Sequence, residues 1–356
     1  MRPINTALCS FGMSGWVFHA PFIQVHPGFK LYAVCERTKK LAQQKYPEVK
    51  SYNTIEAMLE DEAVELVVVN TPNYTHYEFA KLALLAGKHV IVEKPFVVYA
   101  EQGEELIELA KKQDKKLSVY HNRRFDSDYK TVKKVLNEKW LGTVVEAEFH
   151  FDRFKDELSP KVHKENPGPG TGALYDLGSH LIDQGLQLFG EPQFVFADIQ
   201  IIRPISKVDD YFEVLLYYPR RRVRLKSSYL VREALPGYIL HGSRGSFIKA
   251  KTDVQEIMLQ QGKIPDSPDW GKEPESEKGL LHTEKDGKII RALVPSLQGN
   301  YGEYYDGIYN AIRNDQPVPV TAEDGLKVVK LIQAAFESSE KKRAIDFEKD
   351  REKINS

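Results

Sequence analysis

The sequence predicts an α/β protein in which a doubly wound parallel sheet precedes an α+β domain with a large, mostly antiparallel open sheet. Up to about residue 120, short apolar strands alternate with single helices, which is the pattern of βαβ units. Beyond residue 122 the apolar runs are longer and alternate, as in "VVEAEFHFDRF" and "DDYFEVLLYYP". Because 356 residues are too many for one ordinary core, we expect two domains, residues 1–122 and 123–356.

The elements of the first domain follow one another closely. Strands are expected at "TALCSF", "LYAVC", "ELVVVN", "HVIVEKP" and "LSVYH", and helices at "KKLAQQKYP", "THYEFAKLALLAG" and "EELIELAKKQDKK". The strands are apolar and β-branched throughout, so helices should cover both faces of their sheet.

The second domain is expected to begin with a helix, "YKTVKKVLNEKWLG", that a glycine closes. A loop and a helix, "NPGPGTGALYDLGSHLIDQGLQLFG", then interrupt the alternating strands, and residues 262–290 are interpreted as a long surface excursion. The last helix should begin at Thr321, with Asp324 completing a capping pair. Arg220 to Arg224 predicts a hairpin turn, either solvated or in contact with an anion or another subunit.

Composition excludes several classes of protein. The net charge is −1, so there is no global basic field for nucleic acid or an anionic membrane. No run of about 18 apolar residues occurs, so no membrane span is expected. The first strand begins too early in the sequence for a signal peptide to be expected. Cys9 and Cys35 each lie in an apolar run, which favours core positions over a disulfide or a metal site. These features together favour a reducing cytoplasm.

A glycine-containing turn follows the first strand, in "CSFGMSGWVFHAPF". A dinucleotide needs its pyrophosphate against bare backbone N–H groups, and glycine permits that approach. The pattern G-x-G-x-x-G is incomplete because Ser10 stands first, which leaves Gly12 and Gly15. The turn Ser10, Gly12, Met13, Ser14 and Gly15 is therefore a candidate cofactor site.

The end of the second strand, "AVCERTKK", bears on the choice of coenzyme. Glu36 lies about where an acidic residue would bind the ribose hydroxyls of NAD. Arg37, Lys39 and Lys40 would instead favour the 2′-phosphate of NADP. NADP is the expected coenzyme and NAD remains possible; the alternative is a charged helix start that binds no ligand.

Two later strand ends should face the same crevice, because ligands of such sheets bind at the carboxyl ends of the strands. Asn70, Thr71 and Pro72 end one strand and would face the cofactor, whereas His76 either contacts the nicotinamide side or is structural. The other strand ends in "EKP". Its Glu93 could bind a cation or a sugar hydroxyl. Lys94 could hydrogen-bond an alcohol oxygen unless it is an ordinary surface lysine. A cis bond is expected before Pro95.

Asp176 and His180 are spaced i and i+4 in "YDLGSHLID", which places both on one face of a helix. A carboxylate beside an imidazole raises its basicity, as removal of a hydroxyl proton requires. A helix salt bridge or half of a metal site are the alternatives. Because an upstream lysine accompanies the pair rather than further histidines, acid–base work is favoured and no metal is expected.

Taken together these stretches resemble the Gfo/Idh/MocA family of nicotinamide-dependent sugar and polyol oxidoreductases. The resemblance covers nearly the whole chain and includes "EKP", "YHNRRFDSD", "LYDLGSHLIDQ" and "PVTAEDGLKV". It implies a Rossmann domain, and it is nearest to the branch with the NADP-dependent inositol dehydrogenases. It implies that Lys94 orients the substrate hydroxyl, His180 accepts its proton and Asp176 supports His180.

The predicted function is therefore transfer of a hydride between NADP(H) and a secondary hydroxyl of a cyclic polyol or sugar. The alternatives are cleavage of glycosides with a self-regenerating cofactor, or a regulator that senses nucleotides without catalysis. Tyr120, Asn122 and Arg123 should line the substrate cleft, and Asp183 either contacts hydroxyls or is a satisfied helix carboxylate. The open sheet should join a homodimer or homotetramer.

Overall fold

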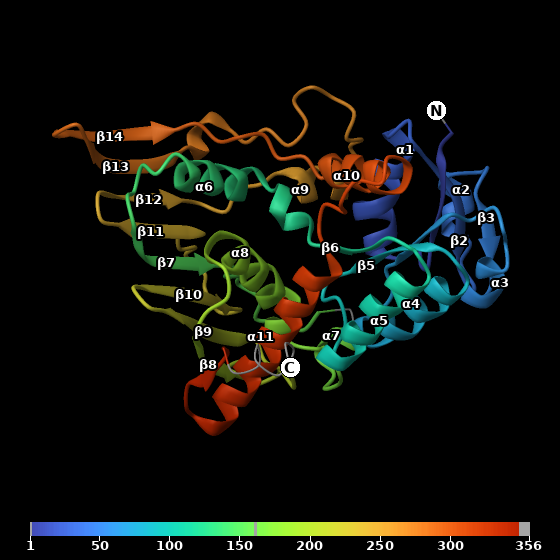
Figure 1. Ribbon diagram of the computed structural model, residues 1–356, viewed down its shortest axis with the longest axis horizontal. Helices are drawn as coiled ribbons and strands as arrows, with labels where there is room; N and C mark the ends of the chain where they lie inside the picture. Colours follow the sequence, from blue (N-terminus) through green and yellow to red (C-terminus); the bar gives the residue numbers. More distant parts are fainter. Residues whose placement is uncertain (1, 160–161, 349–356) are drawn as a thin grey trace. The chain divides into compact units, whose positions relative to one another are not determined.

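The computed structural model describes residues 2–159 and 162–348 and divides into two compact units (Figure 1). The first comprises Met1–Phe125, Val254–Trp270 and Asn300–Lys327; the second comprises Asp126–Asp253, Gly271–Gly299 and Val328–Ser356. Val254–Trp270 and Asn300–Lys327 thus belong to the first unit, whereas a single boundary after residue 122 would place them in the second.

The first unit is built on a six-stranded sheet in the order β3-β2-β1-β4-β5-β6. All of its neighbouring strands pair in parallel. This order is that of the dinucleotide-binding doubly wound fold, so the fold predicted for this region is confirmed. The strands are β1 (Ile4–Leu8), β2 (Phe29–Cys35), β3 (Lys50–Tyr52), β4 (Leu66–Val69), β5 (His89–Glu93) and β6 (Leu117–Tyr120).

The helices of this unit connect and cover those strands. In Figure 1, α4 and α5 lie side by side, and they pack on each other. β4 is buried along its whole length, which explains why its sequence is apolar without alternation. The helical segments are η1 (Ser14–His19), α1 (Ala20–Val25), α2 (Leu41–Lys45), α3 (Ile55–Leu59), η2 (Asn73–Thr75), α4 (His76–Leu85), α5 (Ala100–Lys112), η3 (Asn122–Phe125), α9 (Gln255–Gln260) and α10 (Gly302–Arg313).

The second unit is built on a nine-stranded sheet in the order β14-β13-β12-β11-β7-β10-β9-β8-β15. β7 pairs with β10 in parallel and the other neighbours are antiparallel, as the sequence predicted for most of this sheet. The strands are β7 (Val144–His150), β8 (Phe194–Gln200), β9 (Tyr211–Tyr218), β10 (Arg221–Ser228), β11 (Tyr238–Gly242), β12 (Gly245–Lys249), β13 (Gly279–Lys285), β14 (Lys288–Val294) and β15 (Ile345–Asp346).

Helices of the second unit cover one face of this sheet. In β9 every second residue is buried, beginning with Phe212, and the intervening residues are partly exposed. The buried face packs against α8 (Ser179–Phe189) and the π-helical turn η4 (Leu174–Gly178) that precedes it. The other helices are α6 (Ser127–Asn137), α7 (Val162–Glu165), η5 (Glu275–Glu277) and α11 (Ala322–Lys341), which begins in the first unit.

Two local predictions are confirmed at the ends of elements. Thr321 accepts a hydrogen bond from the Asp324 amide at 3.0 Å, so it caps α11. The Asp324 carboxylate pairs with Arg124 at 3.0 Å instead of completing the expected capping pair. The arginine run forms the β9–β10 hairpin. Its Arg221 guanidinium lies 4.6 Å from the Phe189 ring, and Arg224 pairs with Glu213 at 2.8 Å. The run is therefore held by side chains of its own unit.

The interpretation of residues 262–290 as a surface excursion was wrong for its second half. β13 and β14 form a hairpin that extends the sheet at one edge. Most of β14 is exposed, so its sequence carries little of the apolar alternation that identifies a strand.

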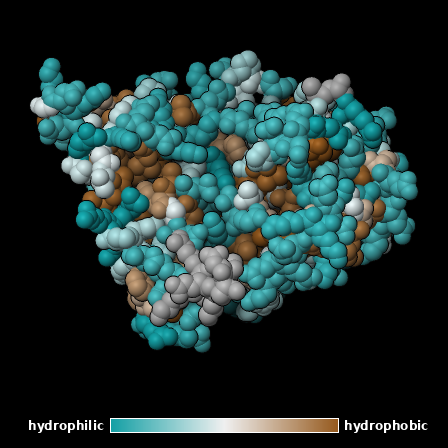
Figure 2. All heavy atoms as spheres, in the orientation of Figure 1, coloured by the Kyte–Doolittle hydropathy of each residue, from teal (hydrophilic) through white to brown (hydrophobic). Residues whose placement is uncertain are grey.

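In the part of the chain that is described, no helix is both long and apolar enough to cross a bilayer. Hydrophilic residues cover most of the face drawn in Figure 2. Cys9 and Cys35 are buried free thiols, and burial raises the pKa of both.

Candidate active site

The turn after β1 is held by Asn70 at the end of β4. The Asn70 side chain accepts from the Ser10 amide at 3.0 Å and donates to the Ser10 carbonyl at 2.9 Å, while the Ser10 hydroxyl donates to the Asn70 carbonyl at 2.8 Å. A Cβ on Gly15 would lie 2.5 Å from the Ser10 carbonyl oxygen, whereas one on Gly12 would meet nothing within 4 Å. A ligand can therefore approach Gly12, and Gly15 lets the chain pack closely against Ser10. Both features fit a bound pyrophosphate.

Glu36 does not present its carboxylate at the surface of this turn. It is 9% exposed, and its two oxygens accept from the amides of Leu41 and Ala42 at 2.8 and 2.9 Å. Glu36 therefore satisfies the first amides of α2, which for this residue agrees with the alternative of a charged helix start and not with a ribose ligand.

The cations after Glu36 divide into two kinds. The Lys40 ammonium donates to the Glu36 carbonyl and the Asn53 side chain, both at 2.7 Å. Arg37 and Lys39 are exposed, and no carboxylate of residues 2–159 or 162–348 forms an ion pair with either. A phosphate on the adenosine ribose would find two available cations here, so these residues fit NADP.

His76 is fully buried, and its ring lies between two backbone carbonyls. Nδ1 is 2.8 Å from the Pro95 oxygen and Nε2 is 2.9 Å from the Thr71 oxygen. Burial lowers its pKa although both carbonyls oppose this. The imidazole therefore joins the turn after β4 to the turn after β5, which is the structural one of the two roles considered.

Glu93, at the end of β5, is at the centre of a polar cluster. One of its oxygens contacts His19 Nε2 at 3.0 Å and accepts a short hydrogen bond from Ser14. His19 Nδ1 in turn contacts the Tyr305 hydroxyl at 2.7 Å. Burial raises the pKa of Glu93, but the contacts with His19, Ser14 and Lys94 outweigh it and lower the pKa to about 2. The carboxylate is therefore ionised at neutral pH.

Lys94 follows directly at the carboxyl end of the sheet. Its amide donates to the second Glu93 oxygen at 3.1 Å, and its side chain is partly exposed. The Lys94–Pro95 bond is cis, so that prediction is confirmed. A lysine at this position can donate a hydrogen bond to an alcohol oxygen.

Of the three expected substrate residues of the first unit, Tyr120 and Arg123 have polar contacts within that unit. The Tyr120 hydroxyl donates to the Phe18 carbonyl at 2.9 Å, and Asn122 is buried. The Arg123 guanidinium donates to the Tyr301 hydroxyl at 3.2 Å and pairs closely with Glu256. Their contact with substrate therefore stays a prediction.

The second unit holds Asp176 and His180 on one helical segment, in η4 and the start of α8. Both Asp176 oxygens accept from the Lys164 ammonium at 3.0 Å. Sequence reasoning missed this lysine, because it lies in a different element and follows no periodic pattern. His180 and Asp183 are buried, at 5% and 2% exposure.

Aromatic and cationic side chains border His180. Its ring centroid is 6.3 Å from that of Phe151, which follows β7. The Phe151 ring also carries the Arg153 guanidinium at 5.1 Å and the Lys251 ammonium at 4.8 Å. The aromatic ring next to the imidazole therefore also contacts two cations, which an alternating strand pattern does not reveal.

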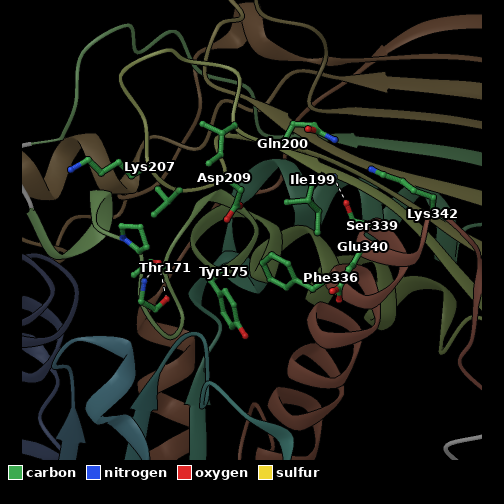
Figure 3. Close-up of a pocket in the computed structure, with 14 residues that line it drawn as sticks. Thr171, Tyr175, Ile199, Gln200, Lys207, Asp209, Phe336, Ser339, Glu340 and Lys342 are labelled. Carbon is green, nitrogen blue, oxygen red and sulfur yellow. Dashed lines mark hydrogen bonds between the residues drawn. The ribbon is translucent and has the colours of Figure 1, made fainter.

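A pocket of about 780 Å³ opens on the second unit beside η4 (Figure 3). The Tyr175 and Phe336 rings stack in it with centroids 5.7 Å apart. Asp209 also borders it, and burial raises its pKa to about 6 although the Leu174 amide donates to it at 2.8 Å. A Cβ on Gly172 would lie 1.8 Å from an Asp209 oxygen, so this carboxyl requires glycine there.

Comparison with known proteins agrees with this geometry. Residues 4–121 match the Gfo/Idh/MocA family model described as an NAD-binding Rossmann fold, and residues 133–347 match its C-terminal alpha/beta domain. The NADP(+)-dependent scyllo-inositol 2-dehydrogenase of Bacillus subtilis is 37% identical over 97% of this chain and 96% of its own.

Two further proteins extend the comparison. D-glucoside 3-dehydrogenase of Escherichia coli is 28% identical over 95% of this chain and 96% of its own. A crystal structure of a Bacteroides fragilis protein has a TM-score of 0.89 and 46% identity over 97% of this chain and all of that one. The matches of both domains and these relatives show that the chain belongs to the Gfo/Idh/MocA family of oxidoreductases and carries its NAD-binding Rossmann domain.

Proposed function

We propose that this oxidoreductase transfers a hydride between NADP(H) and a secondary hydroxyl of a cyclic polyol or sugar. The observation that carries the proposal is Lys94, which lies beside the ionised Glu93 at the carboxyl end of β5 in the NAD-binding unit. Two relatives are named as dehydrogenases of an inositol and a D-glucoside, which are both cyclic polyhydroxy compounds.

Each residue of the proposed site has a separate role in the oxidation. The bound nicotinamide supplies the acceptor for the hydride that leaves the carbon. His180 takes the hydroxyl proton, while the Lys94 ammonium hydrogen-bonds the oxygen as negative charge develops on it. Asp176 supports His180 from the preceding turn, and Lys164 fixes the position of that carboxylate.

The test is a panel of inositols and aldoses assayed with NADP and NAD by the absorbance of the reduced coenzyme. Turnover of one or more cyclic polyols is expected. Coenzyme binding without oxidation of any compound would contradict the proposal and favour a regulator that senses nucleotides. Cleavage of a glycoside without net coenzyme reduction would favour the self-regenerating reaction.

NADP should bind more tightly than NAD, because Glu36 is engaged by backbone amides while Arg37 and Lys39 are available. Arg37→Ala should reduce the preference by about tenfold, as expected for one lost charge-assisted contact. Fluorescence titration with both coenzymes measures this, and Lys112→Ala on α5 is the control for a lost surface cation. Tighter binding of NAD by the unmodified protein would overturn the assignment.

We also propose a homodimer or homotetramer joined through the open face of the nine-stranded sheet. Helices of the same chain cover the other face, and Phe194 and Phe196 on β8 remain 41% and 37% exposed. Exposed aromatic side chains on a sheet favour burial against a partner. Light scattering should give a multiple of 40.7 kDa, and Phe194→Asp with Phe196→Asp should lower it. A monomeric mass at micromolar protein would exclude the assembly.

A further inference from the structure

Three cations, Arg153, Lys155 and Lys164, lie in the region of Asp176 in the second unit. Arg153 and Lys155 extend the line of β7, and their amides donate to the carbonyls of Ser228 and Tyr229 at 2.9 and 2.7 Å. Lys164 approaches the same carboxylate from α7, at 3.0 Å. Lys155 therefore lies within electrostatic reach of Arg153, Lys164 and Asp176, and Asp176 stands one helical turn before His180.

The carboxylates nearby are already engaged by other groups. Asp176 pairs with Lys164. Asp210 and Glu165 pair with the buried Arg203, at 2.7 and 3.4 Å. These three carboxylates therefore pair with cations other than Arg153 and Lys155.

Arg153 and Lys155 lie against aromatic rings instead. The Arg153 guanidinium is 5.1 Å from the Phe151 ring and the Lys155 ammonium is 6.0 Å from the Tyr229 ring. In the described part of the chain, no carboxylate forms an ion pair with either side chain. Burial, followed by the charge of Arg153, lowers the pKa of Lys155; Asp176 and Glu165 oppose this, and Lys164 adds to it. An incoming anion would relieve this repulsion.

The position of these cations relates them to the proposed base. The Phe151 ring that carries Arg153 also lies next to the His180 ring, with centroids 6.3 Å apart. His180 and Arg153 thus both lie next to the Phe151 ring, so a sugar-sized molecule with a hydroxyl at His180 could extend to Arg153. A guanidinium can bind the two oxygens of a carboxylate or phosphate at once, and a neighbouring ammonium adds a point charge.

We propose that the substrate carries an anionic group, a carboxylate or a phosphate, which Arg153 and Lys155 bind while a ring hydroxyl faces His180. This inference rests on the proposed function and narrows its substrate class from neutral polyols to acidic sugars. Lys164 is not part of the anion site, because Asp176 already holds its ammonium.

The test compares D-glucuronate and D-glucose 6-phosphate with D-glucose, and an inositol monophosphate with myo-inositol, in the presence of NADP. The kcat/KM of at least one anion should exceed that of its neutral partner about tenfold or more. Preference for the carboxylate or for the phosphate identifies the group. Equal or better turnover of the neutral partners overturns the inference and leaves the proposed function intact.

Variants link the preference to the two cations. Arg153→Gln and Lys155→Gln should each lower the ratio of anion to neutral kcat/KM by about tenfold, mainly through KM. Arg153→Lys should keep part of the preference. Arg291→Gln, on the exposed face of β14, removes a cation elsewhere in the same unit and should keep all of it. An unchanged ratio in the Arg153 and Lys155 variants overturns the inference.

A binding readout separates this inference from the proposed function. Calorimetric titration of the NADP-loaded protein should show D-glucuronate or D-glucose 6-phosphate binding more tightly than D-glucose, with a steep dependence on salt. Such binding without oxidation would sustain the anion site and remove the proposed function. No difference in affinity between the anions and glucose would remove the anion site whatever the turnover.

Discussion

Lys94→Ala and His180→Ala should each lower kcat by on the order of 10²-fold or more, since positioned acid–base groups typically contribute about that much. Lys94 would no longer stabilise the developing negative charge on the oxygen, and His180 would no longer accept its proton. NADP should still bind, because its phosphates are expected at the turn after β1 and at Arg37. Steady-state assays on the best substrate, together with coenzyme titration, measure both quantities.

The control variants replace the same residue types, a lysine and a histidine, at exposed positions elsewhere in the chain. Lys112→Ala on α5 and His282→Ala on β13 both remove exposed side chains and should leave kcat within about twofold. Near-normal turnover in Lys94→Ala or His180→Ala would take that residue out of the mechanism. A large loss in Lys112→Ala would instead indicate that any lysine deletion harms the protein.

The parallel sheet could be predicted because its strands are buried on both faces and are therefore apolar along their length. β4 and β5 show this directly, with buried runs between helical stretches. The carboxyl ends of the strands also follow from topology, which is why the sequence alone predicts that Lys94 and Asn70 lie near a ligand. Asn70 itself acts through the Ser10 backbone, a contact that joins two loops 60 residues apart and leaves no local pattern.

The partners of charged side chains could not be predicted in the same way. Glu36 stands where a ribose ligand is expected, yet it caps the amides of α2, and only the local chain path decides between the two. Asp176 was expected to support His180, and the Lys164 ammonium, from another element, donates to both of its oxygens. His19 carries no periodic signal, although it holds Glu93. Such contacts depend on tertiary structure, which spacing along the chain does not reveal.

The β13–β14 hairpin was likewise not predicted from the sequence. A buried ion pair fixes the segment that leads into it. The Lys249 ammonium and the Glu273 carboxylate are 2.7 Å apart, with side-chain exposures of 0% and 1%. Lys249 also donates to Thr252 and to the Glu277 carbonyl at 2.8 and 2.7 Å. Glu273 accepts from the hydroxyls of Ser127 and Ser296 at 2.5 and 2.6 Å. The segment that leads into β13 is thus tied to β12 and to the start of α6.

Lys249→Met should lower the free energy of unfolding by about 3–5 kcal/mol, because it leaves the Glu273 carboxylate buried without its cation. Urea unfolding, with hydrogen exchange of β12 and β13 to locate the loss, measures this. The double variant Lys249→Met with Glu273→Leu removes both charges and should recover much of the stability, since an apolar pair of similar volume is often neutral. Lys288→Met on exposed β14 should change the free energy by less than about 0.5 kcal/mol. If Lys249→Met costs no more than Lys288→Met, the ion pair does not fix the segment, and the hairpin must be held by the strand pairing of β12 with β13 alone.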